Sequence, residues 1–110
     1  MPKTNDANAN DLILIPVSYQ KTQDGVMIQI WRDNNIAIYE ETTKGYYEVF
    51  EIIIQYPKPK KINGKKFITT YKELLPHNEA FGKYAYATGS KKRAFEIKDA
   101  LRQRIDNRKN

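Results

Sequence analysis

Short runs rich in apolar, β-branched and aromatic residues recur along the chain, separated by polar turn segments, which is the pattern of β-strands. These runs predict strands over residues 12–20, 26–32, 36–41, 46–56, 67–72 and 80–88. Turn dipeptides such as Asp24-Gly25 and Asn63-Gly64 fall between them. Pro16 removes a ladder donor from the first strand, so that strand is expected at an edge. Short turns between successive strands indicate an antiparallel meander.

The side-chain period of a strand also predicts which residues share a face. By this parity Trp31 and Tyr39 fall on one face of neighbouring strands, and Tyr47 extends the row. An exposed aromatic row can stack on nucleic-acid bases. However, Glu41 and Glu51 fall on the same face by parity and would repel phosphates. The sequence therefore favours a structural role for these aromatic residues, as cross-strand pairs.

One amphipathic helix follows the last predicted strand. Ser90 is a suitable N-cap, and apolar residues recur at helical spacing at Ala94, Ile97, Leu101 and Ile105. This helix of roughly 15 residues would cover the sheet. The predicted fold class is therefore α+β, an antiparallel sheet of about five or six strands packed by one C-terminal helix. A small curled half-barrel is the alternative, because both faces of residues 46–56 carry apolar groups.

Length and composition predict one intracellular domain. The 110 residues suit a single domain over residues 11–107, preceded by a polar disordered tail over residues 1–10. The chain has no cysteine, which excludes disulfides and thiolate ligands and suits a reducing compartment. It has neither the apolar core of a signal peptide nor an apolar run near the ~18 residues of a membrane span. We therefore expect a cytoplasmic protein.

Charge is distributed unevenly along the chain. Residues 1–57 carry four basic and eight acidic side chains, whereas residues 58–110 carry fifteen basic and five acidic ones. The second half is therefore strongly cationic, at +10 against −4 for the first half. If the fold gathers these cations on one surface, a polyanionic partner is the natural expectation.

Two basic segments are the candidate phosphate-binding sites. The first contributes Lys58, Lys60, Lys61, Lys65 and Lys66, with no acid among them. The second is the helix start, with Lys91, Lys92 and Arg93. Cations there oppose the helix macrodipole, and a bound anion would relieve the repulsion. Each segment also has a simpler interpretation. The lysine segment can be a solvated loop, and the charges at the helix start can be screened by solvent and tolerated.

Aromatic residues lie between basic residues just before the helix. Lys83 precedes Tyr84 and Tyr86, and Lys91 follows them. Interleaved basic and aromatic side chains are typical of surfaces that contact phosphates and stack on bases. Tyr84 and Tyr86 are therefore the candidate stacking residues.

Catalytic and metal-binding patterns find little support in the sequence. His77 is the only histidine, and neither serine lies near it in sequence. No spacing of histidines or carboxylates matches a metal site. The sequence thus predicts a protein that is not an enzyme and needs no cofactor or metal.

Two segments, YYEVFEIIIQ and PHNEAFGKYAYATGSKKRAFEI, carry a resemblance that spans roughly residues 26–105. In them the chain resembles small accessory proteins of phages and mobile elements. It implies a bacterial host cell, in which such proteins often bind DNA or block a host factor. A fainter likeness to small sheet-plus-helix nucleic-acid modules concerns strand order alone.

The combined expectation is a sequence-tolerant nucleic-acid-binding accessory protein. The lysine segment and the helix start would contact phosphates of a single- or double-stranded partner. The alternative is a protein-interaction module that inhibits a host nucleic-acid enzyme by placing its basic end in an acidic cleft.

Overall fold

The computed structural model describes residues 12–21, 23, 25–57, 59–62, 64–68 and 71–108, with the backbone alone in 59–62 and 65–68. The predicted tail, residues 1–10, lies outside the described residues. The described chain groups into two compact units. Unit 1 comprises residues 12–15 and 53–75, and unit 2 comprises residues 16–52 and 76–108.

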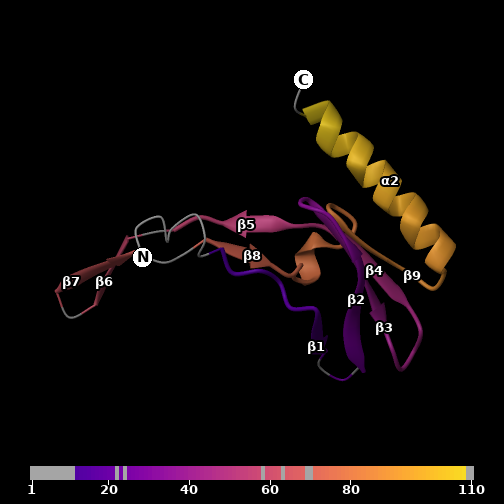
Figure 1. Ribbon diagram of the computed structural model, residues 1–110, viewed down its shortest axis with the longest axis horizontal. Coiled ribbons are helices and arrows are strands. Elements are labelled where there is room, and N and C mark those ends of the chain that lie inside the picture. Colours follow the sequence, from indigo (N-terminus) through magenta and orange to yellow (C-terminus); the bar gives the residue numbers. More distant parts are fainter. Residues whose placement is uncertain are drawn as a thin grey trace, which may run out of the picture. The chain divides into compact units, whose positions relative to one another are not determined.

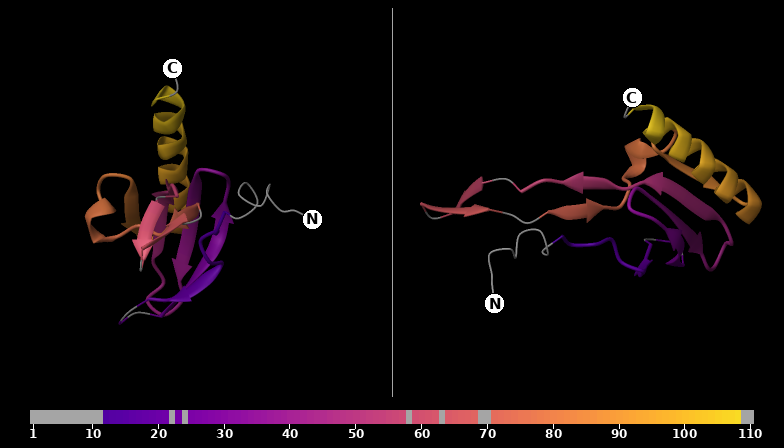
Figure 2. Two further views of the ribbon diagram at one scale, coloured as in Figure 1. Left: turned by 90° about the vertical axis from the view of Figure 1, so that its left-hand side faces the viewer. Right: turned by 45° about the horizontal axis from the view of Figure 1, so that its top comes forward.

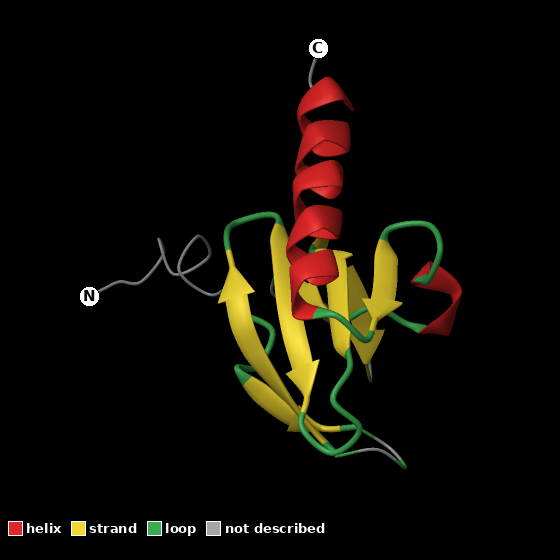
Figure 3. Ribbon diagram, turned by 90° about the vertical axis from the view of Figure 1, so that its right-hand side faces the viewer, coloured by secondary structure: helices red, strands yellow, loops and turns green. Residues whose placement is uncertain are grey.

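Unit 2 contains a five-stranded antiparallel sheet packed against one helix, α2 (Lys91–Arg108) (Figures 1 and 3). Its strands, in spatial order, are β1 (Ser18–Gln20), β2 (Val26–Arg32), β3 (Ile36–Glu41), β4 (Tyr47–Glu51) and β9 (Ala85–Thr88). A 3-10 turn, η1 (Asn78–Ala80), precedes β9. The predicted α+β class is confirmed. Within the described residues the sheet stays open, with β1 and β9 as its edges, and no barrel closes.

The helix begins where the sequence predicts. The Ser90 hydroxyl accepts a hydrogen bond from the Arg93 backbone N–H at 3.1 Å, and the Ser90 carbonyl accepts from Ala94 N. One face of the helix packs on the sheet, and the buried cluster comprises Ile36, Ile38, Val49, Ala94, Leu101 and Ile105. Burying each large aliphatic side chain contributes about 1.5–3 kcal/mol. The apolar stripe is thus the helix's attachment to the sheet.

The predicted aromatic row does not form, because β2 contains a bulge. Gln29 pairs with Tyr39, but Trp31 pairs with Ile38, so Ile30 is an extra residue in the ladder. The bulge moves Trp31 to the helix-covered face, where it meets Phe95 at 6.4 Å between ring centroids. Tyr39 lies on the opposite face. The expectation that the two share a face is therefore wrong.

The face of the sheet opposite the helix also carries a core. Its fully buried side chains include Met27, Ala37, Tyr39, Phe50 and Ala85. Tyr39 stacks on Phe50 at 5.6 Å and meets the edge of Tyr19. The Tyr39 hydroxyl donates to the Pro16 carbonyl and accepts from the Gln29 side chain. Residues on both faces of the sheet are therefore tightly packed.

The long strand predicted over residues 46–56 is instead two strands. β4 ends at Glu51, opposite Ile36, the first residue of β3. The next N–H, that of Ile52, donates to Asn35 O at 2.7 Å in the β2–β3 turn rather than to a strand. Because β3 has no further residue to pair with β4 beyond Glu51, the chain leaves the sheet here. β5 (Ile53–Gln55) then pairs elsewhere.

Unit 1 is built on two nested antiparallel ladders (Figures 1 and 2). β5 pairs with β8 (Lys72–Leu74), and β6 (Pro59–Ile62) pairs with β7 (Lys65–Ile68). Ile13 joins β8 through a parallel bridge to Lys72. We call residues 53–74, which run out through β5 and β6 and back through β7 and β8, the lysine arm. The strand predicted over residues 67–72 is replaced by β7 and β8.

Two carboxylates of unit 2 hold the turns of the sheet. Asp33 accepts from the backbone N–H groups of Asn35 and Ile36, each at 2.8 Å, and pairs with Arg102 of the helix. Burial alone would raise the Asp33 pKa, but these hydrogen bonds and the guanidinium hold it below its usual range. This pair ties the β2–β3 turn to α2.

Glu41 is fully buried and accepts four backbone hydrogen bonds, from Gly25, Thr43, Lys44 and Gly45. Burial would raise the pKa of its carboxyl, but the four N–H donors hold it below its usual value. A Cβ at position 25 would overlap Thr43 Oγ1 and Glu41 Oε2, so any larger residue there would have to displace the Thr43 and Glu41 side chains.

Glu41→Gln is expected to destabilise the protein at pH 7 and to make its stability depend less on pH below about 4.5. The lowered native pKa stabilises the fold above the unfolded value of 4.5, and that stabilisation is lost as pH falls through the native pKa. A glutamine side chain offers one acceptor oxygen and no titration. Urea unfolding at several pH values measures the difference. Glu40→Gln is the matched control, and an equal loss in both variants would contradict the assignment.

Candidate nucleic-acid interface

The lysine arm presents its basic residues on an antiparallel hairpin. The register pairs Lys61 with Lys66, Lys60 with Phe67 and Ile62 with Lys65. The turn at its end uses Gly64 at φ +82°, a left-handed conformation that favours glycine. Lys58 and Asn63 lie outside the described residues. Of the predicted phosphate-binding residues, the structure thus brings Lys60, Lys61, Lys65 and Lys66 onto one two-stranded ladder.

The remainder of unit 1 adds an aromatic pair and a buried acid. Tyr56 is 66% exposed and meets Tyr71 edge-on, with ring centroids 5.5 Å apart. Glu73 is the only acid in residues 53–75. It is buried, and one carboxylate oxygen accepts from the Ile15 backbone N–H at 3.1 Å. The lysines thus share their unit with an exposed tyrosine, while Glu73 is buried and bonds to the backbone.

The second predicted segment, the helix start, lies in unit 2. Lys91 and Lys92 are exposed, and neither forms an ion pair within the described part of the chain. Arg93 pairs with Glu96 at 3.2 Å, but both side chains are at least half exposed, so the pair contributes little. The first turn of α2 contains no acid. The predicted conflict between basic residues and the helix macrodipole is therefore present.

Several other cations of unit 2 are neutralised by acids. These ion pairs are Lys21–Glu48, Lys98–Asp99, Arg102–Asp33 and Arg108–Glu51. Lys98 also lies 4.9 Å from the centre of the Trp31 ring. For Lys21, burial would lower the pKa, but hydrogen bonds with Glu48 and Tyr46 raise it above its ordinary value. Because acids pair with these cations, the basic surface of unit 2 is smaller than its composition suggests.

The predicted stacking residues differ in their surroundings. Tyr86 lies on β9, packs against the helix-covered core, and its hydroxyl donates to Lys83 O at 3.0 Å. The Arg104 guanidinium donates to the same hydroxyl at 2.7 Å and to Lys83 O at 2.9 Å. Tyr84 is half-buried and directly precedes β9, and the Lys83 side chain is exposed. Tyr86 is therefore anchored at its hydroxyl end.

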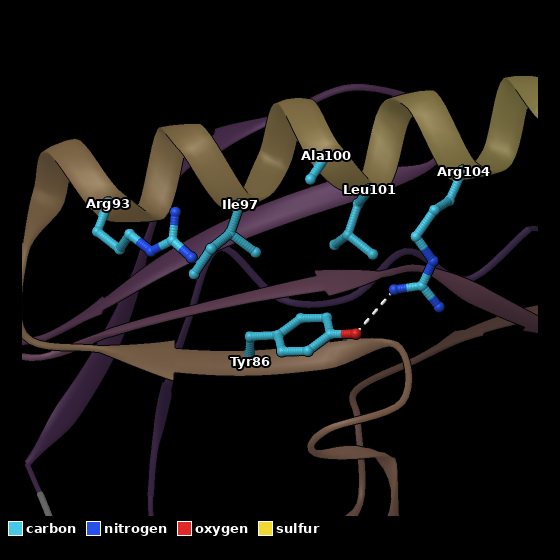
Figure 4. A pocket seen from close by; sticks show the side chains of 6 residues that line it. All are labelled: Tyr86, Arg93, Ile97, Ala100, Leu101 and Arg104. Carbon is cyan, nitrogen blue, oxygen red and sulfur yellow. Dashed lines mark hydrogen bonds between the residues drawn. The ribbon is translucent and has the colours of Figure 1, made fainter.

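A pocket of about 200 Å³ opens between β9 and α2 (Figure 4). Its lining comprises Tyr86, Arg93, Ile97, Ala100, Leu101 and Arg104. The structure thus brings two predicted residues, Tyr86 and Arg93, together with an arginine that sequence reasoning missed. Arg104 lies eleven residues after Arg93, three helical turns along the same stripe. That spacing was readable from the sequence once the core stripe was known.

The residues weighed for catalysis have structural roles. His77 Nδ1 accepts the Glu79 backbone N–H at 3.2 Å and caps η1, while Ser90 caps α2. In the part of the chain that the structure describes, no cluster of three acidic or histidine side chains could hold a metal ion. Among the same residues, no helix is long and apolar enough to cross a bilayer.

Comparison of the chain with protein-family models, curated proteins and solved structures finds no match.

Proposed function

We propose that this protein binds nucleic acid through the lysine arm, with the phosphate backbone as the main partner. The observation that carries the proposal is the register of β6 and β7, which sets Lys61 directly opposite Lys66 within a ladder of four lysines and no acid. Like charges at opposite ladder positions destabilise an antiparallel pair. A polyanion would remove that cost, and each neutralised phosphate releases counterions.

Two further features support a nucleic-acid partner. Tyr56, at the base of the arm, exposes two-thirds of its surface and can stack on an unpaired base. Lys91 and Lys92 add exposed positive charge at the start of α2. Because both contacts are independent of base identity, binding is expected to tolerate sequence changes. An accessory role in a bacterial host, as the resemblance implies, remains part of this proposal.

A mobility-shift titration over single-stranded DNA, duplex DNA and RNA, at low and physiological salt, tests the proposal. With about five phosphates contacted, the logarithm of the affinity should fall with the logarithm of the salt concentration at a slope near −4 to −5. An affinity that does not change between low and physiological salt would rule the proposal out. A single stoichiometric protein partner that survives nuclease treatment of a bacterial lysate would instead favour an inhibitor of a host enzyme.

A further inference from the structure

The pocket between β9 and α2 forms a groove with charged ends and an apolar floor. Ile97, Ala100 and Leu101 form the floor, while Arg93 and Arg104 lie at the two ends (Figure 4). Four of the five lining residues on α2 form a stripe beside the core stripe, at positions 93, 97, 100 and 104. This flank of the helix faces β9, the edge strand of the sheet.

The outer edge of β9 lies beside this groove and is open only in part, because Gly82 N donates to Ala85 O at 2.8 Å. Glu51 N donates to Tyr84 O at 2.9 Å, which sets the phase of the β4–β9 ladder. Because hydrogen-bonded pairs alternate in an antiparallel ladder, Tyr86 bonds toward β4 and Ala87 faces outward. Among the described residues, no backbone group bonds to the N–H or C=O of Ala87. An unpaired edge of this kind is a template for an added strand.

Both arginines retain donors for a ligand. Arg104 uses one nitrogen for Tyr86 Oη and another for Lys83 O, which fixes its guanidinium at the end of the groove. A guanidinium has five N–H donors, so further bonds remain possible. Among the residues that the structure describes, Arg93 pairs only with Glu96, in a solvent-exposed pair that a ligand can displace. The ends of the groove thus select negative charge.

We propose that this groove binds an extended acidic peptide of a partner protein, which adds a strand to β9. The backbone of the peptide would pair with Ala87, and one apolar side chain would lie on Ile97 and Leu101. Carboxylates two residues before and after that side chain would reach Arg93 and Arg104. In a strand these carboxylates are about 13 Å apart, close to the ~16 Å between the two arginine positions along the helix. Strand addition to a free edge is a common mode of peptide recognition.

This inference does not depend on the proposed function. All of its residues belong to unit 2, whereas the lysine arm belongs to unit 1. Charge reversal in the arm should therefore leave peptide binding unchanged, and blocking the groove should leave the arm's phosphate contacts in place. Failure of one proposal is distinguishable from failure of the other.

The test uses the full chain and a labelled, end-blocked peptide, Thr-Glu-Thr-Leu-Thr-Glu-Thr, with affinity followed by anisotropy. We expect saturable binding of one peptide per chain and slower hydrogen exchange at the Ala87 amide. Ala100→Leu, which fills the groove, and Arg93→Gln should each weaken binding about tenfold. Glu96→Gln should tighten it by freeing Arg93. Gln103→Leu, an exposed position of α2 outside the groove, is the matched control and should have no effect.

Changes in the peptide keep the test valid if a protein variant fails to fold. Replacing both glutamates with lysine should abolish binding, and N-methylation of the central leucine should weaken it. Equal binding of the lysine peptide, or binding without protection of Ala87, would overturn the proposal. So would a (dT)12 oligonucleotide that displaces the peptide and itself protects Ala87, because the groove would then be part of the nucleic-acid surface.

Discussion

Replacing Lys60 and Lys61 with glutamine is expected to weaken duplex DNA binding about 60-fold at 0.1 M salt. Each phosphate contact contributes a factor of about eight at that salt concentration, because the slope of log affinity against log salt is near −0.9 per contact. The slope should therefore become less negative by about two units. The loss should be similar for all sequences, since phosphates carry no base identity. Anisotropy titrations at four salt concentrations measure both quantities.

Net charge alone could also weaken binding, so the control must match it. Lys60→Gln with Lys61→Gln lowers the net charge from +6 to +4. Asn34→Asp with Gln103→Glu makes the same change at two exposed positions of unit 2. The control should keep the wild-type slope. If both double variants lose affinity equally, binding follows overall charge and the arm has no special part in it.

Phe50→Ala is expected to cause the largest loss of stability, about 3–5 kcal/mol. The ring is fully buried on the sheet face opposite the helix and stacks on Tyr39 at 5.6 Å. Removing it leaves a cavity that neighbouring strands cannot close, and the ring contact with Tyr39 is lost as well. Urea unfolding at pH 7 measures the change.

Phe95→Ala is the matched control for this prediction. Phe95 lies on the helix, is only partly buried, and contacts Trp31 edge-on. The same truncation there should cost clearly less, because part of the ring already faces water. A greater loss at Phe95 than at Phe50 would contradict the conclusion that the second face of the sheet carries a core.

The hydrophobic pattern was sufficient for two strands and for the helix. Residues 26–32 and 36–41 form strands with the predicted bounds, and Ser90 caps the predicted helix. These elements depend on local signals, namely short β-rich runs between turn residues, an apolar period of 3.6 residues and a capping hydroxyl. Local signals lie within a few residues of one another, so they can be read without knowing the fold.

The features that the pattern missed depend on partners distant in sequence. The bulge at Ile30 shows itself only in the pairing of β2 with β3, and it reverses the face of Trp31. The break at Ile52 follows from the end of β3 and the bond to Asn35 O. The sequence is apolar through both places, with Ile30-Trp31 in one and residues 52–54 in the other, so it shows neither interruption. A tertiary constraint therefore overrode a local pattern in each case.

The candidate site was predicted in part for the same reason. A run of five lysines without an acid is visible in the sequence, and its hairpin follows from Asn63-Gly64. The groove is not visible, because it requires that β9 lie at the edge of the sheet and that α2 lie beside it. The place of Arg104 in the groove cannot be predicted from the sequence, because it depends on hydrogen bonds to Tyr86 Oη and Lys83 O, which are distant in sequence.

Lysine acetylation footprinting tests most directly whether the arm is the nucleic-acid-binding surface. The protein would be treated with an acetylating reagent, with and without a saturating oligonucleotide, and modification would be read residue by residue by mass spectrometry. We predict that the oligonucleotide protects five lysines of the arm (Lys58, Lys60, Lys61, Lys65 and Lys66) and leaves Lys44 and Lys98 unchanged. Full reactivity of the arm lysines in the bound state would contradict the account.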